Sequence, residues 1–287
     1  MAVFERNYKR WTGEMTPRAT RFLILPRYLF RDVFASKLLT FFYAGCFLFP
    51  IGCLAWIYVT HSAKFLQFFP DLQTQELFAV DGEFIARFLE VQSVLAFALA
   101  LFIGPGLVSR DLANNGLPLY LSRPFPRTEY VLGKFTVLAT LLSTITWMAG
   151  ALVIAAQVGF EGMGWLSKNL SIVVAVFTVS WLWIGVLCML ALSVSAWVRW
   201  KPIAGFAMLF ILLGGKFFAV LTNFLFKTEL GWLFDFGHLH SVLQSNWLGV
   251  EPPSELSPVT AAIGLCCFIA FFLFLLNRKI RAYEVVS

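Results

Sequence analysis

The sequence predicts an all-α membrane protein: a polytopic bundle of six transmembrane helices with an amphipathic interfacial helix at its N-terminus. The first observation is composition, because 59% of the 287 residues are hydrophobic and 13% are charged, with a mean hydropathy of +0.78. A soluble domain could not bury that much apolar surface. The second is a series of apolar runs near or above the roughly 18–20 residues that a helix needs to cross a bilayer. Such long continuous runs favour helices over the short alternating strands of a barrel.

The six predicted spans form the transmembrane domain, residues 38–276. They are 38–59, 91–108, 135–158, 170–198, 203–226 and 259–276. Only the fifth contains a charge, Lys216, and it can still cross if that ammonium reaches an interface or faces protein.

Residues 1–37 are expected to form a cytoplasmic N-terminus that stays on the chain, since no compact apolar core with a cleavage site occurs there. Pro26 can occupy the first turn of an amphipathic helix, which has one apolar and one basic face. Leu29, Phe30, Val33 and Phe34 share the apolar face, and Arg27 and Arg31 share the other. This pattern indicates an amphipathic helix at the membrane surface, which either anchors the chain or also contacts a cytoplasmic partner.

Basic residues predict the orientation, because positively charged loops tend to stay in the cytoplasm. With the N-terminus inside, 17 Lys and Arg residues fall on the inner side and 5 on or near the outer side. Both termini, including the tail 277–287, are then cytoplasmic. We expect a multi-pass protein of the bacterial plasma or inner membrane. The net charge of +6 fits this topology and attraction to anionic lipid, and no nucleic-acid partner is predicted.

The outer segment 223–258 is rich in Trp and Phe, as in "GWLFDFGHLHSVLQSNWLG". It is predicted to lie along the outer interface as an aromatic belt, or to dip back into the protein as short helices. A ligand pocket is the less favoured interpretation. The five cysteines lie inside predicted spans and are interpreted as small packing residues, since their spacing matches neither a disulfide framework nor a zinc site.

Groups that could perform catalysis are scarce. The sequence contains no H-E-x-x-H, no G-x-S-x-G and no G-x-x-x-x-G-K-[ST], so no means of hydrolysing ATP is visible in this chain. Asp235, His238 and His240 could meet at a metal, but two histidines at i, i+2 do not share a helix face. We therefore predict no catalytic, cofactor-binding or metal-binding residue.

Three charged residues lie near the outer halves of spans. Arg87 and Glu90, at i, i+3, are expected to form a local ion pair or, alternatively, a substrate gate. Lys216 is expected to reach an interface, or else to bind an anionic substrate. All three are candidates for a substrate path.

The inner loop 109–134 is unusual for a membrane protein. Gly104-Pro105-Gly106 is predicted to bend the second span near its end, just before this loop. Asn114-Asn115-Gly116 favours a turn, and "LPLYLSRP" predicts a short helix along the membrane surface. Prolines then end that helix before Glu129 opens the third span. A short helix between two rigid exits, with apolar and charged residues exposed together, indicates a docking element for another protein.

This loop also carries a family resemblance. It contains Ser109-Arg110-Asp111-Leu112, Asn115-Gly116, "LYLSRP" at 119–124, Arg127, Tyr130 and Gly133-Lys134. The pattern resembles the first cytoplasmic loop of permease subunits in the ABC type-2 exporter class. The six spans, the inside termini and the aromatic outer segment agree with that family's layout.

The resemblance implies the transmembrane permease subunit of an ATP-driven exporter, which is not itself an enzyme. Its partners would be a separate ABC ATPase, holding ATP and Mg, and a second permease copy or homologue in surrounding lipid. The loop would act as a coupling helix seated in the ATPase. By position, its contacts are assigned to Asp111, Asn115, Leu119, Ser122, Arg123 and Arg127. Two alternatives stay open: a lipid-active membrane enzyme, and a non-transporting scaffold or sensor subunit.

Overall fold

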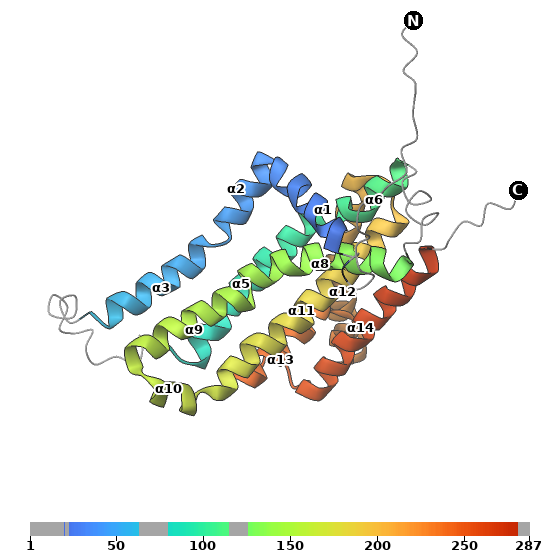
Figure 1. Ribbon diagram of the computed structural model, residues 1–287. Helices are drawn as coiled ribbons and strands as arrows, with labels where there is room; N and C mark the ends of the chain where they lie inside the picture. The colour runs from blue at the N-terminus through green and yellow to red at the C-terminus, as the bar shows by residue number, and fades with distance from the viewer. Residues whose placement is uncertain (1–19, 21–22, 63–79, 115–125, 281–287) are drawn as a thin grey trace, which may run out of the picture.

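The computed structural model describes residues 20, 23–62, 80–114 and 126–280, and within these ranges it contains helices and no strand. In chain order the helices are α1 (Ile24–Ala35), α2 (Lys37–Gly45), α3 (Leu48–Thr60), α5 (Gly82–Ile103), α6 (Pro105–Ala113), α8 (Arg127–Ile145), α9 (Trp147–Glu161), α10 (Met163–Lys168), α11 (Leu170–Trp197), α12 (Lys201–Phe226), the 3₁₀ helix η4 (Leu230–Phe234), α13 (Phe236–Leu248) and α14 (Pro258–Lys279). The all-α fold is confirmed (Figure 1).

Six helical segments of the described chain are long and apolar enough to cross a membrane. They are α2 with α3, α5 with α6, α8 with α9, and the single helices α11, α12 and α14. This confirms the six predicted spans, including the fifth with Lys216 inside it. The chain is a multi-pass membrane protein.

Helix α11 is the centre of the bundle (Figure 1). It packs against α5, α6, α8, α9, α12, α13 and α14. Residues from successive turns of α11, such as Ile184, Leu187 and Leu190, are fully buried. Helix α11 therefore contacts nearly every other span of the bundle.

The second span is interrupted at Gly104, between α5 and α6, at the position where Gly104-Pro105-Gly106 predicted a bend. Pro105 occupies the first position of α6, where its missing N–H leaves no intrahelical bond unmade. Gly104 also lies against α11. A Cβ atom there would stand 2.5 Å from Ala191 Cβ, so only glycine permits this close approach.

Ser195 on α11 stabilises the interruption. Its Oγ accepts the N–H groups of Val108 (3.0 Å) and Ser109 (2.9 Å) and donates to the carbonyl of Pro105 (2.8 Å). Ser195 is fully buried. One hydroxyl thus satisfies three backbone groups, which fixes α6 to α11 because a buried polar group without a partner is costly.

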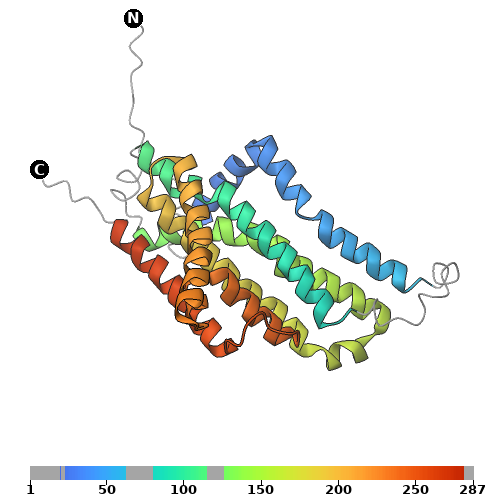
Figure 2. The same ribbon diagram turned by 180° about the vertical axis from the view of Figure 1, so that it is seen from behind.

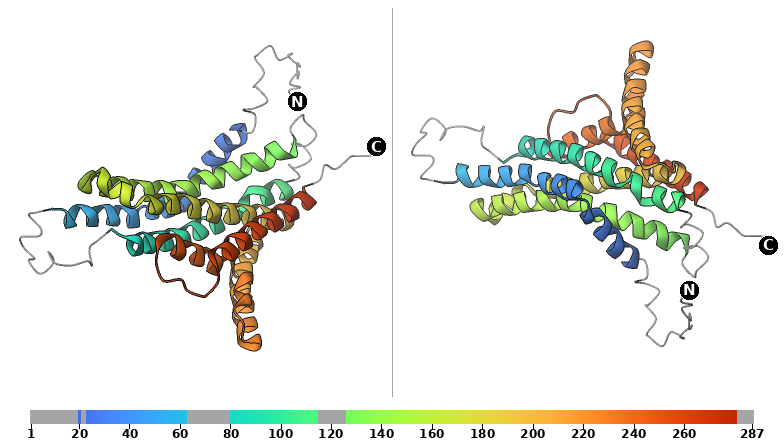
Figure 3. Two further views of the ribbon diagram at one scale, coloured as in Figure 1. Left: turned by 90° about the horizontal axis from the view of Figure 1, so that it is seen from below. Right: turned by 90° about the horizontal axis from the view of Figure 1, so that it is seen from above.

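Helix α12 leans away from the layer formed by the other helices (Figures 2 and 3). Its large side chains are widely exposed, including Phe206, Phe210, Phe217 and Phe224. This is the composition that a helix surrounded by lipid requires.

The 3₁₀ helix η4 folds back directly onto α12. The Gly231 N–H donates to Asn223 Oδ1 at 2.7 Å. A Cβ at Gly231 would lie 2.5 Å from the Ala219 carbonyl oxygen, so the two backbones approach as closely as a glycine allows.

Helix α13 returns into the bundle and packs against α5, α11 and α14. Phe236, Leu239 and Leu243 on it are buried, and their spacing of three and four residues describes one helix face. The outer segment therefore contains short helices that dip back into the protein, which was one of its two predicted arrangements.

Helix α1 packs on α8. Leu29, Phe30 and Val33 are half-buried toward the core, whereas Phe34, predicted for the same face, is exposed, as are Arg27 and Arg31. The amphipathic character of α1 stays a prediction, as does its position at a membrane surface.

Candidate functional site

Two regions hold the candidate functional residues. The first is the end of the bundle at which α6 stops at Ala113 and α8 starts at Arg127, called here the loop end. The second is a cavity toward the opposite end of the bundle, called the distal cavity. Helices α5 and α6 together connect the two.

At the loop end, an ion pair joins α6 to α8. Lys134 Nζ lies 2.9 Å from Asp111 Oδ2, and the Tyr130 hydroxyl donates to the same carboxylate oxygen at 2.7 Å. The Lys134 ammonium is also 5.5 Å from the centre of the Tyr130 ring. We call these three residues the Asp111–Lys134–Tyr130 cluster.

The cluster is buried, and this decides its strength. Lys134 is 2% exposed and Tyr130 is 0% exposed. A charge removed from water is stable only when it is paired and hydrogen-bonded, so removing either partner is strongly destabilising. The cluster therefore fixes the spacing between the end of α6 and the start of α8, the two helices that flank residues 115–125.

Most of the predicted ATPase contacts lie outside the described residues: Asn115, Leu119, Ser122 and Arg123. Arg127 is exposed at the first position of α8, where a partner could reach it. Asp111 instead contacts Lys134 and Tyr130 within the same chain.

The sequence contains one signal for the pairing of Asp111 with Lys134: an acidic residue precedes residues 115–125 and a basic residue follows them. Lys134, at the end of the inner loop 109–134 and just before the third predicted span, lies inside the protein.

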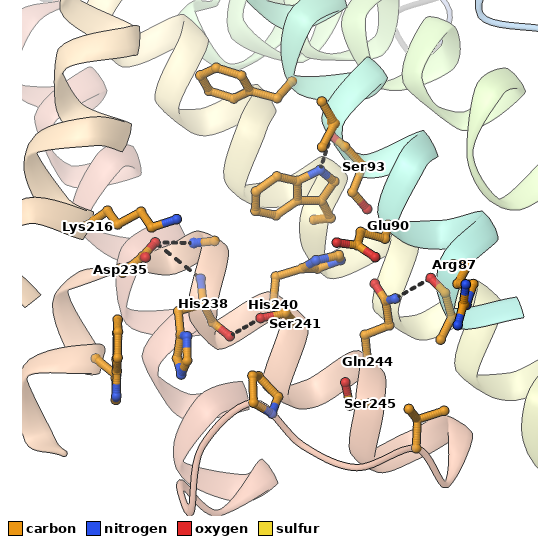
Figure 4. A pocket seen from close by; sticks show the side chains of 18 of the residues that line it. Arg87, Glu90, Ser93, Lys216, Asp235, His238, His240, Ser241, Gln244 and Ser245 are labelled. Atoms are coloured by element: carbon orange, nitrogen blue, oxygen red, sulfur yellow. Dashed lines mark hydrogen bonds between the residues drawn. The ribbon is translucent and has the colours of Figure 1, made fainter. Parts of the chain in front are cut away.

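The distal cavity has a volume of about 920 Å³ and is walled by α5, α11, α12, η4, α13 and the segment that follows α13. Figure 4 shows how its polar residues are arranged. Its aromatic lining residues are Phe97, Trp183 and Trp232. The outer segment 223–258 thus lines a cavity as well as carrying the aromatic residues on which an interface belt was predicted.

The three residues predicted for a substrate path all line this cavity. Arg87 and Glu90 come from α5, and Lys216 comes from α12. Figure 4 shows Glu90 and Lys216 directed into the space between these helices. The structure therefore brings together side chains that are more than 120 residues apart in the sequence.

The predicted Arg87–Glu90 ion pair is wrong. Among the described residues, the ion pairs join Lys134 to Asp111 and His61 to Glu161, and neither Arg87 nor Glu90 is part of one. An i, i+3 pair contributes only about 0.2–0.5 kcal/mol on a helix. Each charge facing a polar cavity can therefore stay separately solvated with little loss.

Asp235, His238 and His240 do not form a metal site. The Asp235 carboxylate caps α13 by accepting the N–H groups of Gly237 (2.9 Å) and His238 (3.2 Å). His238 stacks on Trp232 with ring centres 4.1 Å apart, and its Nε2 is 2.9 Å from Ser254 Oγ. No group of three metal-ligating side chains occurs in the described part of the chain.

Both histidines are held toward the neutral form. Burial lowers the pKa of His240 to about 3, because its ring is 4% exposed and lies 4.4 Å from the Trp183 ring. Burial also lowers the pKa of His238, and the Lys216 ammonium lowers it further, while the carboxylates of Asp235 and Glu229 act in the opposite direction. The cavity's cationic groups at neutral pH are therefore Arg87 and Lys216.

A comparison with family models decides the class of protein. The model described as "ABC-2 family transporter protein" matches residues 34–229, which include all helices from α2 to α12. The chain belongs to the ABC-2 transporter family. As an ABC-2 protein it is a permease component of an ABC transporter, a class of system that includes an ATPase partner. A comparison with curated proteins finds no match.

Proposed function

We propose that this ABC-2 permease is the membrane subunit of an exporter, and that a separate ATPase drives it through the loop between α6 and α8. The observation that carries the proposal is the Asp111–Lys134–Tyr130 cluster at the base of that loop. Because the cluster holds both flanking helices together, a force applied to the loop moves α6 and α8 as one piece.

The path from the loop to the distal cavity also supports this mechanism. Helix α6 is fixed to α11 through Ser195, and α11 contacts α5, α12 and α13, which wall the cavity. In the proposed cycle, ATP binding closes the ATPase pair and shifts the permease between two arrangements. Such a shift requires that each arrangement bind the ATPase with a different affinity.

Orientation and assembly belong to the same proposal. The 17 to 5 distribution of basic residues supports cytoplasmic termini and a loop on the ATPase side of a bacterial plasma or inner membrane. We propose that two permease bundles, either two copies of this chain or this chain and a homologue, assemble in lipid with two ATPase subunits.

Purification from the native membrane in mild detergent tests the proposal. A co-purifying ATPase in stoichiometric amount is the expected result. Charge reversal at two loop positions, Arg123→Glu with Arg127→Glu, is expected to reduce the amount of bound ATPase at least tenfold while the permease yield is unchanged.

Lys168→Glu is the matched control, because Lys168 is an exposed base on α10 that lies apart from both regions. Unchanged ATPase binding after the double reversal would contradict the assignment of the loop. An ATPase-free preparation that converts lipid would favour a membrane enzyme instead.

A further inference from the structure

We propose that the distal cavity binds a zwitterionic amphiphile, with its anionic group at Lys216, its ammonium group at Glu90 and its apolar tail leaving between α5 and α12. The inference rests on the proposed function, since it assigns a substrate class to the same permease.

The first argument is the position of the two charges within helices long and apolar enough to cross a membrane. Lys216 lies ten residues before the end of α12 at Phe226, and Glu90 lies eight residues after the start of α5 at Gly82. At about 1.5 Å per residue, the distances from the helix ends are ~15 Å and ~12 Å. Ionisable residues within membrane-spanning helices typically face the protein interior or a cavity, and they mark binding sites or pathways.

The second argument is that these charges are left unpaired. Among the described residues, no ion pair or hydrogen bond of the Glu90 carboxylate or the Lys216 ammonium occurs. The two groups enter the cavity from different helices (Figure 4). The loop end, where a buried ammonium and a carboxylate meet at 2.9 Å, demonstrates the alternative arrangement. At the cavity, open volume separates the opposite charges.

The third argument is the balance of charge around the cavity. The charged lining residues are two cations, Arg87 and Lys216, and four carboxylates, Glu83, Glu90, Asp235 and Glu251. Asp235 is compensated by the N-terminal N–H groups of α13, which it caps. Glu83 lies in the first turn of α5, where the helix dipole compensates a negative charge.

Two cations and two carboxylates then remain uncompensated: Arg87, Lys216, Glu90 and Glu251. A ligand with only a negative charge would be repelled by the carboxylates, and one with only a positive charge by the two cations. A zwitterion leaves the balance unchanged and satisfies both signs at once. The indole N–H of Trp183 donates to the Ser93 carbonyl at 3.1 Å, which places an aromatic ring one helical turn from Glu90.

The fourth argument concerns the tail. Val94 on α5 and Leu213 on α12 both line the cavity and are 65% and 55% exposed, respectively. These exposed apolar residues at the margin of the cavity are where we place the tail of the ligand. A headgroup in the cavity with an acyl chain along this margin places each part of an amphiphile in a matching environment.

Binding of a fluorescent short-chain phosphatidylethanolamine to the purified full-length permease, with its ATPase when that co-purifies, tests the proposal. Lys216→Gln and Glu90→Gln are each expected to weaken binding about tenfold to a hundredfold, because each removes one charge-assisted contact. The exchanged pair, Lys216→Glu with Glu90→Lys, is expected to recover most of the affinity. Lys168→Gln and Glu255→Gln are the matched controls, since both residues are exposed at the same end of the bundle and neither lines the cavity.

Competition separates the possible ligands. Unlabelled phosphatidylethanolamine is expected to displace the probe, whereas phosphatidylglycerol and diacylglycerol are not. Displacement by soluble phosphoethanolamine at the same concentration would overturn the role of the tail. Equal displacement by all three lipids, or unchanged binding to Lys216→Gln and Glu90→Gln, would overturn the site itself. ATPase co-purification from the same preparations keeps the two proposals apart, since an ATPase-bound permease that does not bind the probe contradicts only this inference.

Discussion

At the loop end, the Lys134 ammonium is enclosed by the protein and lies 2.9 Å from a carboxylate, whereas at the distal cavity the Lys216 ammonium faces open volume on an exposed part of α12. Both lysines lie within helices that can span the membrane. The first contributes to the shape of the protein and the second is available to a ligand. The difference teaches that pairing, more than residue type, separates a structural charge from a candidate binding charge in this permease.

Removing the carboxylate at the loop end is expected to have the largest effect on stability. Asp111→Ala leaves the Lys134 ammonium buried without a partner, which lowers the free energy of unfolding by about 3–5 kcal/mol. Detergent-titrated unfolding followed by helical circular dichroism measures it. Arg127→Gln removes an exposed charge nearby and should change stability by less than about 0.5 kcal/mol. Equal stability of Asp111→Ala and wild type would show that the pair has no structural role.

Ser195→Ala extends the comparison to the junction of α6 and α11. The change leaves two N–H groups and one carbonyl without the serine hydroxyl, and we expect a loss of about 1–3 kcal/mol in the same unfolding assay. Ser193→Ala is the matched control, because Ser193 is equally buried and donates only to Leu190 in its own helix. Similar losses for both variants would assign the effect to burial alone.

The buried His240 side chain makes the free energy of unfolding depend on pH. Its pKa of about 3 in the folded protein lies below the ordinary value of 6.5, so the unfolded chain binds a proton that the folded chain does not. Stability is therefore constant above about pH 6.5 and falls as the pH is lowered toward 3. Between pH 7 and 5 the loss is about 2 kcal/mol. His240→Phe should abolish this part of the dependence, and an identical pH profile in the variant would contradict it.

Lys216→Gln is expected to have the smallest effect, within about 0.5 kcal/mol of wild type, because the side chain has no ion pair among the described residues. The same assay measures this change beside Lys134→Gln, which deprives Asp111 of its partner and should be clearly destabilising. Equal destabilisation by the two substitutions would remove the distinction between the two regions.

The sequence predicts the spans well because their signal is local. Long apolar runs locate all six, and Gly104-Pro105 locates the interruption between α5 and α6. The spacing of Phe236, Leu239 and Leu243 also indicates the buried face of α13. The abundance of aromatic residues in this segment instead favoured a belt at the outer membrane interface. Local patterns thus predict helices and their faces more readily than their depth.

The functional groups are harder to predict because their partners are distant in the chain. Asp111 and Lys134 meet only after the loop between them brings α6 beside α8. Lys216 joins Arg87 and Glu90 only because α12 and α5 wall the same cavity. The expected Arg87–Glu90 pair failed for the opposite reason. The i, i+3 spacing gives the ion pair only a small energetic advantage, and the separate solvation of each charge in the cavity outweighs it.

The close contact at Gly231 makes η4 and α12 a single wall of the cavity. Since Asn223 and Ala219 hold η4 directly against α12, a tilt of α12 carries Trp232 and Lys216 along with it as one rigid body. Glu90 and Arg87 stay with α5, which is packed on α11. The spacing between the two sets of charges therefore depends on the angle of α12. A headgroup bound as proposed would be held between an α12–η4 unit and an α5–α11 unit.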